Sequence, residues 1–138
     1  MPANQDHALD VIAIGRSSVD LYGQQIGSRL EDIATFSKSV GGCPANIAVG
    51  TARLGLKSGL ITGVGAEQMG RFIIEQCARE GVATQGIKID KERLTALVLL
   101  AVEDEGVSPM IFYRPDCADM AITEDDVDEA FVKSSASV

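Results

Sequence analysis

The sequence predicts an α/β fold built on a parallel sheet, and three observations lead to this prediction. Short apolar runs rich in β-branched residues alternate with segments whose apolar residues recur at helical spacing, as in parallel sheets whose strands are joined by helices. Two other segments, residues 19–40 and 95–113, have the character of paired, half-exposed strands. The chain has 138 residues, 46% of them hydrophobic, which is enough for one domain with its own core.

The first half of the chain is expected to run from a buried strand through a β excursion into a helix. Residues 8–14 (ALDVIAI) form the apolar run that predicts the strand. The segments VDLYGQQIG and IATFSKSV, broken by Gly23 and Gly27, predict two half-exposed strands. Pro44 suits the first turn of the helix that follows, because its missing N–H would be unpaired there anyway, and Gly55 suits the position just beyond the helix end.

A second buried strand and a second helix come next. Residues 59–65 (GLITGVG) predict the strand, and a helix is expected from about Glu67 to Glu80, closed by Gly81. One face of this helix is apolar. The residues on that face are Met69, Phe72, Ile73 and Cys77.

The last third of the chain predicts a short strand, a hairpin and a helix. After a strand at 87–89, the apolar runs TALVLLAV and PMIFY flank a polar turn at 103–106 and predict the hairpin. Thr123, followed three residues later by Asp126, predicts the N-terminus of a final helix. The sequence ends at SSASV, about where this helix should give way to a further strand, so we expect a truncated domain.

The charge balance excludes several classes of function. Lys and Arg number 12 against 20 Asp and Glu, a net charge of −8. A field of this sign repels phosphate backbones and anionic lipids, and the basic residues are scattered, so we expect no nucleic-acid partner and no membrane role. The N-terminus shows no secretion signal, and no apolar run approaches the roughly 18 residues that span a bilayer. A cytoplasmic location is therefore expected.

Several motifs suggest chemistry that the spacing does not support. The stretch GTARLGLKS, residues 50–58, nearly fits a P-loop, but Leu56 separates the glycine from the lysine that must follow it. The glycines at 63, 65 and 70 miss the dinucleotide fingerprint by two positions. The acidic run at 124–129 lacks the glycine and ligand spacing of an EF-hand and suits a helix N-terminus. The three cysteines are odd in number and the chain has one histidine, so neither a disulfide framework nor a metal site is expected.

The candidate site combines Asp20, just past the first strand, with the run Gly41-Gly42-Cys43-Pro44-Ala45-Asn46. Glycines allow close approach of a ligand to the backbone, and the helix start leaves N–H groups unpaired. Asn46 both donates and accepts hydrogen bonds, while Asp20 accepts them, a set suited to vicinal sugar hydroxyls. The alternative is a helix entry whose asparagine satisfies local backbone groups. Spacing alone does not decide between them.

The stretch GGCPANIAVGTARLGLKSGLITGVG, residues 41–65, resembles the N-terminal signature of the PfkB, or ribokinase-like, carbohydrate kinases. IAIGRSSVDLYG resembles the first strand and substrate aspartate of that family. GAEQMGRFIIEQCAREGV resembles its G-x-D-x-x-G-x-x-[IFL] segment, with Glu67 where aspartate is usual. The resemblance covers about residues 9–133. Within the family, GRSSVDLYG and YRPDCADMAI most resemble the 5-dehydro-2-deoxygluconate kinases of inositol catabolism.

The resemblance implies a ribokinase-like fold, with a Rossmann-like parallel sheet, flanking helices and a small β-sheet lid formed by residues of about 19–40 and 95–115. It implies an ATP- and Mg²⁺-dependent kinase acting on a sugar or sugar acid. It also implies substrate-binding roles, which fall on Asp20, Gly41, Gly42, Asn46, Tyr113 and Arg114.

The catalytic base, anion hole and nucleotide loops of the family lie in later segments, including a D-T-x-G-A-G-D motif that this sequence lacks. We therefore expect residues 1–138 to be the substrate-binding part of a kinase domain, inactive alone, with no catalytic residue of its own. Oligomers through the lid or an exposed sheet edge are expected. The alternatives are a non-catalytic sugar-binding or regulatory module and, less favoured by the failed glycine fingerprint, a nicotinamide-dependent oxidoreductase.

Overall fold

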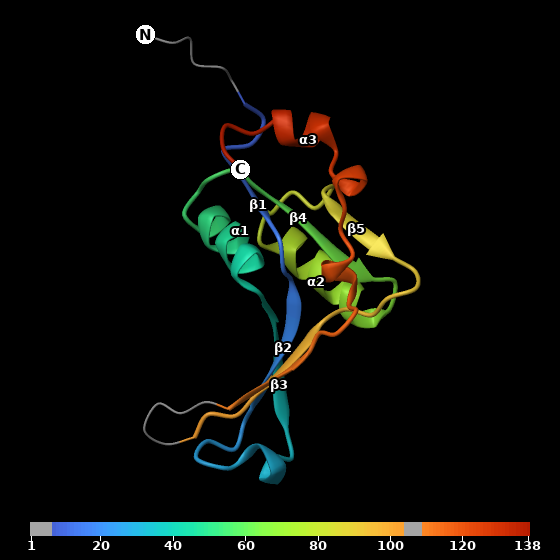
Figure 1. Ribbon diagram of the computed structural model, residues 1–138. Helices are drawn as coiled ribbons and strands as arrows, with labels where there is room; N and C mark the ends of the chain where they lie inside the picture. The colour runs from blue at the N-terminus through green and yellow to red at the C-terminus, as the bar shows by residue number, and fades with distance from the viewer. Residues whose placement is uncertain (1–6, 104–108) are drawn as a thin grey trace.

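The computed structural model describes residues 7–103 and 109–138 and contains two β-sheets (Figure 1). The first is a parallel sheet in the order β1-β4-β5, and every residue of its central strand is buried. This confirms the parallel α/β sheet predicted from the apolar runs. Its strands are β1 (Val11–Ile14), β4 (Ser58–Gly65) and β5 (Ile87–Asp90).

The second sheet has four strands in the order β3-β2-β6-β7. Its antiparallel pairs, β2–β3 and β6–β7, are the two strand pairs that the sequence predicts, although residues 104–108, which include most of the predicted turn, lie outside the described residues. A parallel pair, β2–β6, joins them. The strands are β2 (Ser18–Gly23), β3 (Phe36–Gly41), β6 (Leu97–Leu100) and β7 (Met110–Tyr113).

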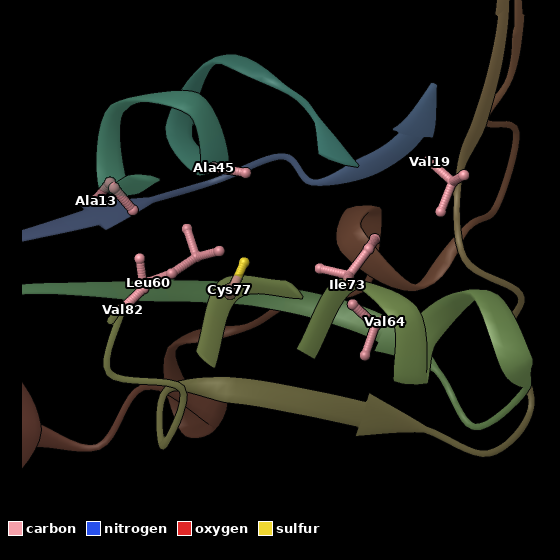
Figure 2. Packing of buried hydrophobic residues seen from close by; sticks show 9 residues of the cluster. Ala13, Val19, Ala45, Leu60, Val64, Ile73, Cys77 and Val82 are labelled. Carbon is pink, nitrogen blue, oxygen red and sulfur yellow. The ribbon is translucent and has the colours of Figure 1, made fainter. Parts of the chain in front are cut away.

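Two helices, α1 (Cys43–Arg53) and α2 (Gln68–Arg79), pack on one face of the parallel sheet. In Figure 2, side chains from β1, β4, α1 and α2 point toward one another across this layer. The helix α1 contributes only small buried side chains, Ala45 and Ala48, so its backbone lies close to the strands. In α2 the predicted apolar face is confirmed, because Ile73 and Cys77 are buried in the same cluster.

The opposite face of the parallel sheet is covered by α3 (Glu129–Lys133). Phe131 of this helix packs against Ile12 and Ile61, whose side chains point away from the α1 and α2 layer because side chains alternate along a strand. Beyond α3 the chain returns to β1, where the Ile12 N–H donates to the carbonyl oxygen of Ser137 at 2.9 Å. The parallel sheet is thus covered by helices on both faces.

The ends of α1 follow the sequence prediction. Gly42 precedes the helix with φ of +97°, and a Cβ there would overlap the carbonyl oxygen of Arg16. Pro44 occupies the first turn, and Gly55 follows the helix with φ of +92°. Glycine is favoured at both positions because positive φ strains other residues.

The final helix differs from its prediction. The capping box of Thr123 and Asp126 forms, but the turn it begins is a single 3₁₀ turn, Glu124–Asp126. Asp126 also binds Lys88 of β5 at 2.8 Å, the backbone becomes extended at Val127, and α3 begins after a second cap at Asp128. The capped turn is therefore separate from the helix and carries a tertiary ion pair, which a local pattern does not reveal.

Candidate functional site

The register of the second sheet sorts its side chains onto two faces. Asp20 of β2 lies opposite Ser39 and Val98, and Val98 lies opposite Phe112, so these four residues share one side, the Asp20 face. The other side, the Leu97 face, continues into the core of the parallel sheet. Its residues include Val19, Val40, Leu97 and Tyr113.

Asp20 lies directly against Gly41, at the end of β3. A Cβ at position 41 would overlap the carboxyl group of Asp20, so the absence of a side chain there makes room for it. The Ser18 hydroxyl donates to Asp20 Oδ1 at 2.8 Å and fixes that oxygen. The second oxygen, Oδ2, accepts no hydrogen bond from the residues that the structure describes, and the carboxylate is only partly buried. Asp20 can therefore accept a hydrogen bond from a ligand hydroxyl.

Gly42 brings the start of α1 against the link between β1 and β2, through its contact with Arg16. The Arg16 guanidinium lies over the ring of Phe112, 5.4 Å from the centroid, in a cation–π contact between that link and β7. Phe112 belongs to the Asp20 face. The helix start, Asp20 and β7 are thus held around one region at the junction of the two sheets.

Asn46 has an exposed side chain in the first turn of α1, while its backbone N–H donates to the Gly42 carbonyl at 2.9 Å. It lines a cavity of about 370 Å³ between β3, α1 and α2, together with Ser39, Lys38 and Phe72. No hydrogen bond joins Asn46 to Asp20 within the described residues. Ser39 lines this cavity and is paired with Asp20 across the strands, whereas Lys38 and Val40, which also line it, belong to the Leu97 face.

Arg114 directly follows β7, and its Nε donates to Asp119 Oδ2 at 2.7 Å. The arginine side chain is 34% exposed, whereas that of Asp119 is fully buried. The structure therefore pairs Arg114 with a protein carboxylate but leaves part of the guanidinium accessible.

Tyr113 does not join the other candidate residues. It lies opposite Leu97, on the face directed away from Asp20, and lines cavities there with Leu97, Leu99 and Ile111. The register therefore places Tyr113 apart from Asp20, and its contact with the sugar stays a prediction.

The metal and redox chemistry available to the described residues is limited. Across residues 7–103 and 109–138, no group of three or more His, Cys, Asp or Glu side chains is placed to hold a metal ion. Cys43 is exposed, and Cys77 and Cys117 are buried. Burial raises the pKa of the Cys77 thiol to about 11, which keeps it protonated near neutral pH. In the same part of the chain, no helix is long and apolar enough to cross a membrane.

Sequence reasoning missed two supporting residues, since Ser18 orients Asp20 and Arg16 reaches Phe112. The pairing of Arg114 with a nearby aspartate, Asp116 or Asp119, is the sequence-based alternative to a ligand contact, and the structure shows Asp119 as the partner. Ser18 could have been suspected, because it lies two residues from Asp20. The other contacts join segments that are distant in sequence or separated by a turn.

Comparison with known proteins identifies relatives of the whole chain. A 5-dehydro-2-deoxygluconokinase of Geobacillus kaustophilus is 38% identical over 134 residues, which cover 96% of this chain and 40% of that protein. The protein of the same name from Bacillus subtilis is 36% identical over 133 residues, covering 96% of this chain and 41% of the relative. This chain therefore spans about two fifths of the length of these curated relatives.

Solved structures of carbohydrate kinases have the same fold. The PfkB protein from Polaromonas sp. JS666 matches with a TM-score of 0.87 and 31% identity, over 93% of this chain and 43% of that one. An uncharacterized sugar kinase from Pyrococcus horikoshii in complex with ATP matches with a TM-score of 0.83 and 34% identity, over 88% of this chain and 39% of that one. The predicted ribokinase-like fold class is confirmed. Since the model of the pfkB family carbohydrate kinases matches residues 8–138, the chain belongs to that family.

Proposed function

We propose that this chain is the sugar-binding part of an ATP-dependent kinase that phosphorylates a hydroxyl of a sugar acid of the 5-dehydro-2-deoxygluconate type, in inositol catabolism. The observation that carries the proposal is the accepting carboxylate of Asp20 beside the glycine pair at the start of α1, and a partly accessible arginine, Arg114, directly after β7 adds to it. The names of the relatives support the substrate.

The proposed roles follow from the chemistry of each group. Asp20 accepts a hydrogen bond from a sugar hydroxyl through Oδ2. Gly41 makes room for the Asp20 carboxylate, Gly42 lets the start of α1 lie against Arg16, and Asn46 donates to one sugar hydroxyl and accepts from another. The second sheet then serves as a lid over the sugar, made from the segments of about 19–40 and 95–115.

Arg114 supplies the specificity for an acid. A guanidinium can bind a carboxylate through two parallel hydrogen bonds, which a lysine cannot reproduce. Arg114 directly follows β7, whose Phe112 lies on the Asp20 face. In the proposed complex a hydroxyl of the substrate meets Asp20 and its carboxylate meets Arg114.

ATP and Mg²⁺ are part of the proposal for the whole protein, and no residue of this chain is assigned to either. The described residues hold no candidate metal cluster, and the motif that supplies a catalytic base in this family does not occur in the sequence. The γ-phosphoryl group would come from bound ATP. The contribution of this chain is to bind and orient the sugar and to shield it from water.

An assay of ADP release tests the proposal. The full-length protein that contains this chain should release ADP when 5-dehydro-2-deoxygluconate, ATP and Mg²⁺ are present together, at about the 1–100 s⁻¹ typical of kinases. The 138-residue chain alone should release none. Binding of the sugar acid without turnover by the full-length protein would favour the non-catalytic module instead, and a change in NADH fluorescence on titration would favour the oxidoreductase.

We also propose that the protein forms homo-oligomers through the second sheet. The edge strand β7 exposes four consecutive apolar side chains, between 43% and 53% of each being accessible. An exposed apolar edge strand is a template for pairing with another copy. Light scattering should show a dimer or larger species, and Ile111→Lys should reduce it to a monomer. A monomeric wild type at micromolar concentration would refute this.

A cytoplasmic location completes the proposal. Its support is that all three cysteines are free in the structure, as thiols are in a reducing compartment.

A further inference from the structure

Asp119 is a buried carboxylate to which the proposed function gives no role. Its side chain is fully buried, and its Oδ2 accepts a single hydrogen bond, from Arg114 Nε at 2.7 Å. The other oxygen, Oδ1, is buried and has no hydrogen-bond partner among the described residues. A buried carboxylate with an unpaired oxygen lowers the stability of the fold, and such a group calls for a functional explanation.

The turn that carries Asp119 packs against the parallel sheet. This 3₁₀ turn, Ala118–Met120, lies against Gly63 of β4, where a Cβ would overlap the Ala118 carbonyl. The Ala118 N–H also donates to the Leu94 carbonyl at 2.9 Å. Asp119 therefore has a packed support, and the Cys117 N–H, just before the turn, donates to the Arg114 carbonyl at 3.1 Å.

The single contact leaves the ligand-binding edge of the guanidinium open. The hydrogen bond to Asp119 comes from Nε, and neither terminal nitrogen of Arg114 makes a hydrogen bond within residues 7–103 and 109–138. The two terminal nitrogens form one edge of the planar fork, which matches the two oxygens of a carboxylate. The hydrogen bond from Nε to Asp119 fixes the plane of the guanidinium and the direction of its terminal nitrogens.

We propose that Asp119 is the positioning residue of Arg114: it orients the guanidinium so that the terminal nitrogens meet the carboxylate of a sugar acid. This inference rests on the proposed function, since it assumes that Arg114 binds that carboxylate. Asp119 itself does not touch the substrate.

The test compares an acid with a neutral sugar in the full-length protein. The probes are 5-dehydro-2-deoxygluconate and its counterpart with a hydroxymethyl group in place of the carboxylate. Asp119→Asn keeps the shape but removes the charge, and it should raise the KM for the acid by about 10- to 100-fold, while the KM values for the neutral sugar and for ATP stay within about twofold. Asp119→Glu, whose longer side chain displaces the guanidinium, should also raise the KM for the acid.

Two controls separate positioning from a general structural role. Asp116 lies in the same loop, is 84% exposed and pairs with Arg93 at 2.9 Å, so Asp116→Asn should leave the KM for the acid unchanged. In an Arg114→Lys background, Asp119→Asn should add no further loss for the acid, because its effect passes through the guanidinium. Circular dichroism checks the fold of each variant, and Asp119→Glu replaces Asp119→Asn if the latter does not fold.

The inference is overturned if Asp119→Asn weakens acid and neutral sugar equally, or if its effect persists at full size beside Arg114→Lys. It is also overturned if Arg114→Lys leaves the KM for the acid unchanged. Failure of the proposed function looks different, because the wild-type protein would then bind the acid without ADP release. The same comparison of variants is then made from calorimetric dissociation constants for the acid.

Discussion

The backbone N–H of Thr95 donates to Glu67 Oε1 at 2.7 Å, which ties the start of α2 to the segment that leads into β6. The other oxygen of Glu67 accepts the N–H groups of Met69 and Gly70 at 2.6 and 2.9 Å. The Thr95 hydroxyl in turn accepts the Gly65 N–H at 2.9 Å. One carboxylate thus caps a helix of the parallel layer and fixes the entry to the second sheet.

Replacing this carboxylate should destabilise the protein. Glu67→Ala removes three hydrogen bonds to partly buried N–H groups, and we expect the free energy of unfolding to fall by about 1–3 kcal/mol. Urea unfolding followed by circular dichroism measures the change. Glu75→Ala, in the same helix, removes only an exposed pair with Arg79 and should cost less than about 0.5 kcal/mol. Equal losses for both variants would contradict the role given to Glu67.

The same residue predicts a dependence of stability on pH. Burial favours the protonated form of Glu67, but the hydrogen bonds from Thr95, Gly70 and Met69 outweigh burial and lower its pKa below the usual 4.5. A carboxyl whose pKa is lower in the folded state stabilises the protein above its unfolded pKa, and this contribution is lost as the pH falls through the folded pKa.

Wild type should therefore exceed Glu67→Gln in unfolding free energy at pH 6, and the difference should shrink as the pH falls below 4.5. Urea titrations at several pH values measure it. A difference that stays constant from pH 6 to pH 3 would show that the charge of Glu67 makes no contribution.

A side chain at position 41 should weaken binding of the sugar. In Gly41→Ala the new methyl group must displace the Asp20 carboxylate from its position beside Ser18, and we expect the KM for the sugar to rise by about tenfold or more. Gly50→Ala is the matched control, because a Cβ there meets nothing within 4 Å. In that variant the KM should stay unchanged and the unfolding free energy should rise by about 0.5–1 kcal/mol.

Replacing Asp20 or Asn46 should weaken binding of the sugar and leave binding of ATP unchanged. In the full-length protein, Asp20→Ala or Asn46→Ala should raise the KM for the sugar by one to two decades, since hydrogen bonds to charged groups contribute roughly 1.5–3 kcal/mol. The KM for ATP should change little, and the exposed Asp125→Asn should change neither. Equal shifts for sugar and ATP would reject the assignment of these residues to the sugar.

The cysteines should differ in reactivity. Cys43 is exposed, whereas burial raises the pKa values of Cys77 and Cys117 and so disfavours their reactive thiolates. With an aromatic disulfide reagent at pH 8, we expect one thiol to react in the native protein and two more after unfolding. Cys43→Ser should remove the fast reaction. Two fast thiols in the wild type would contradict the burial seen here.

Local patterns predicted the elements of this fold well, because their signals lie within each element. Pro44 and Gly55 bracket α1 as expected, and the apolar face of α2 is buried. What the local patterns did not predict involves contacts between distant segments. The final helix is divided between a 3₁₀ turn, where Asp126 binds Lys88, and α3, and the pairing of β7 with β6 places Tyr113 on the face opposite to Asp20.

The candidate site was predictable only in part for the same reason. Glycine and asparagine at a helix start, with an aspartate after a strand, indicate a polar pocket from residue chemistry alone. The support of Arg114 by Asp119 depends on a turn docked against Gly63, and the pairing of Ser39 with Asp20 depends on strand register. Neither relationship has a signature within a short stretch of sequence.

The parallel pairing of β2 with β6 has a consequence for the order of folding. Val19 lies opposite Leu97, so most of the chain must be closed into a loop before this pair can form. Contacts between residues so distant in sequence slow folding, and during synthesis β2 can pair with β6 only after β6 has left the ribosome. The parallel sheet with α1 and α2 can assemble first. The region that carries Asp20 and Arg114 is therefore expected to be among the last to acquire its native structure.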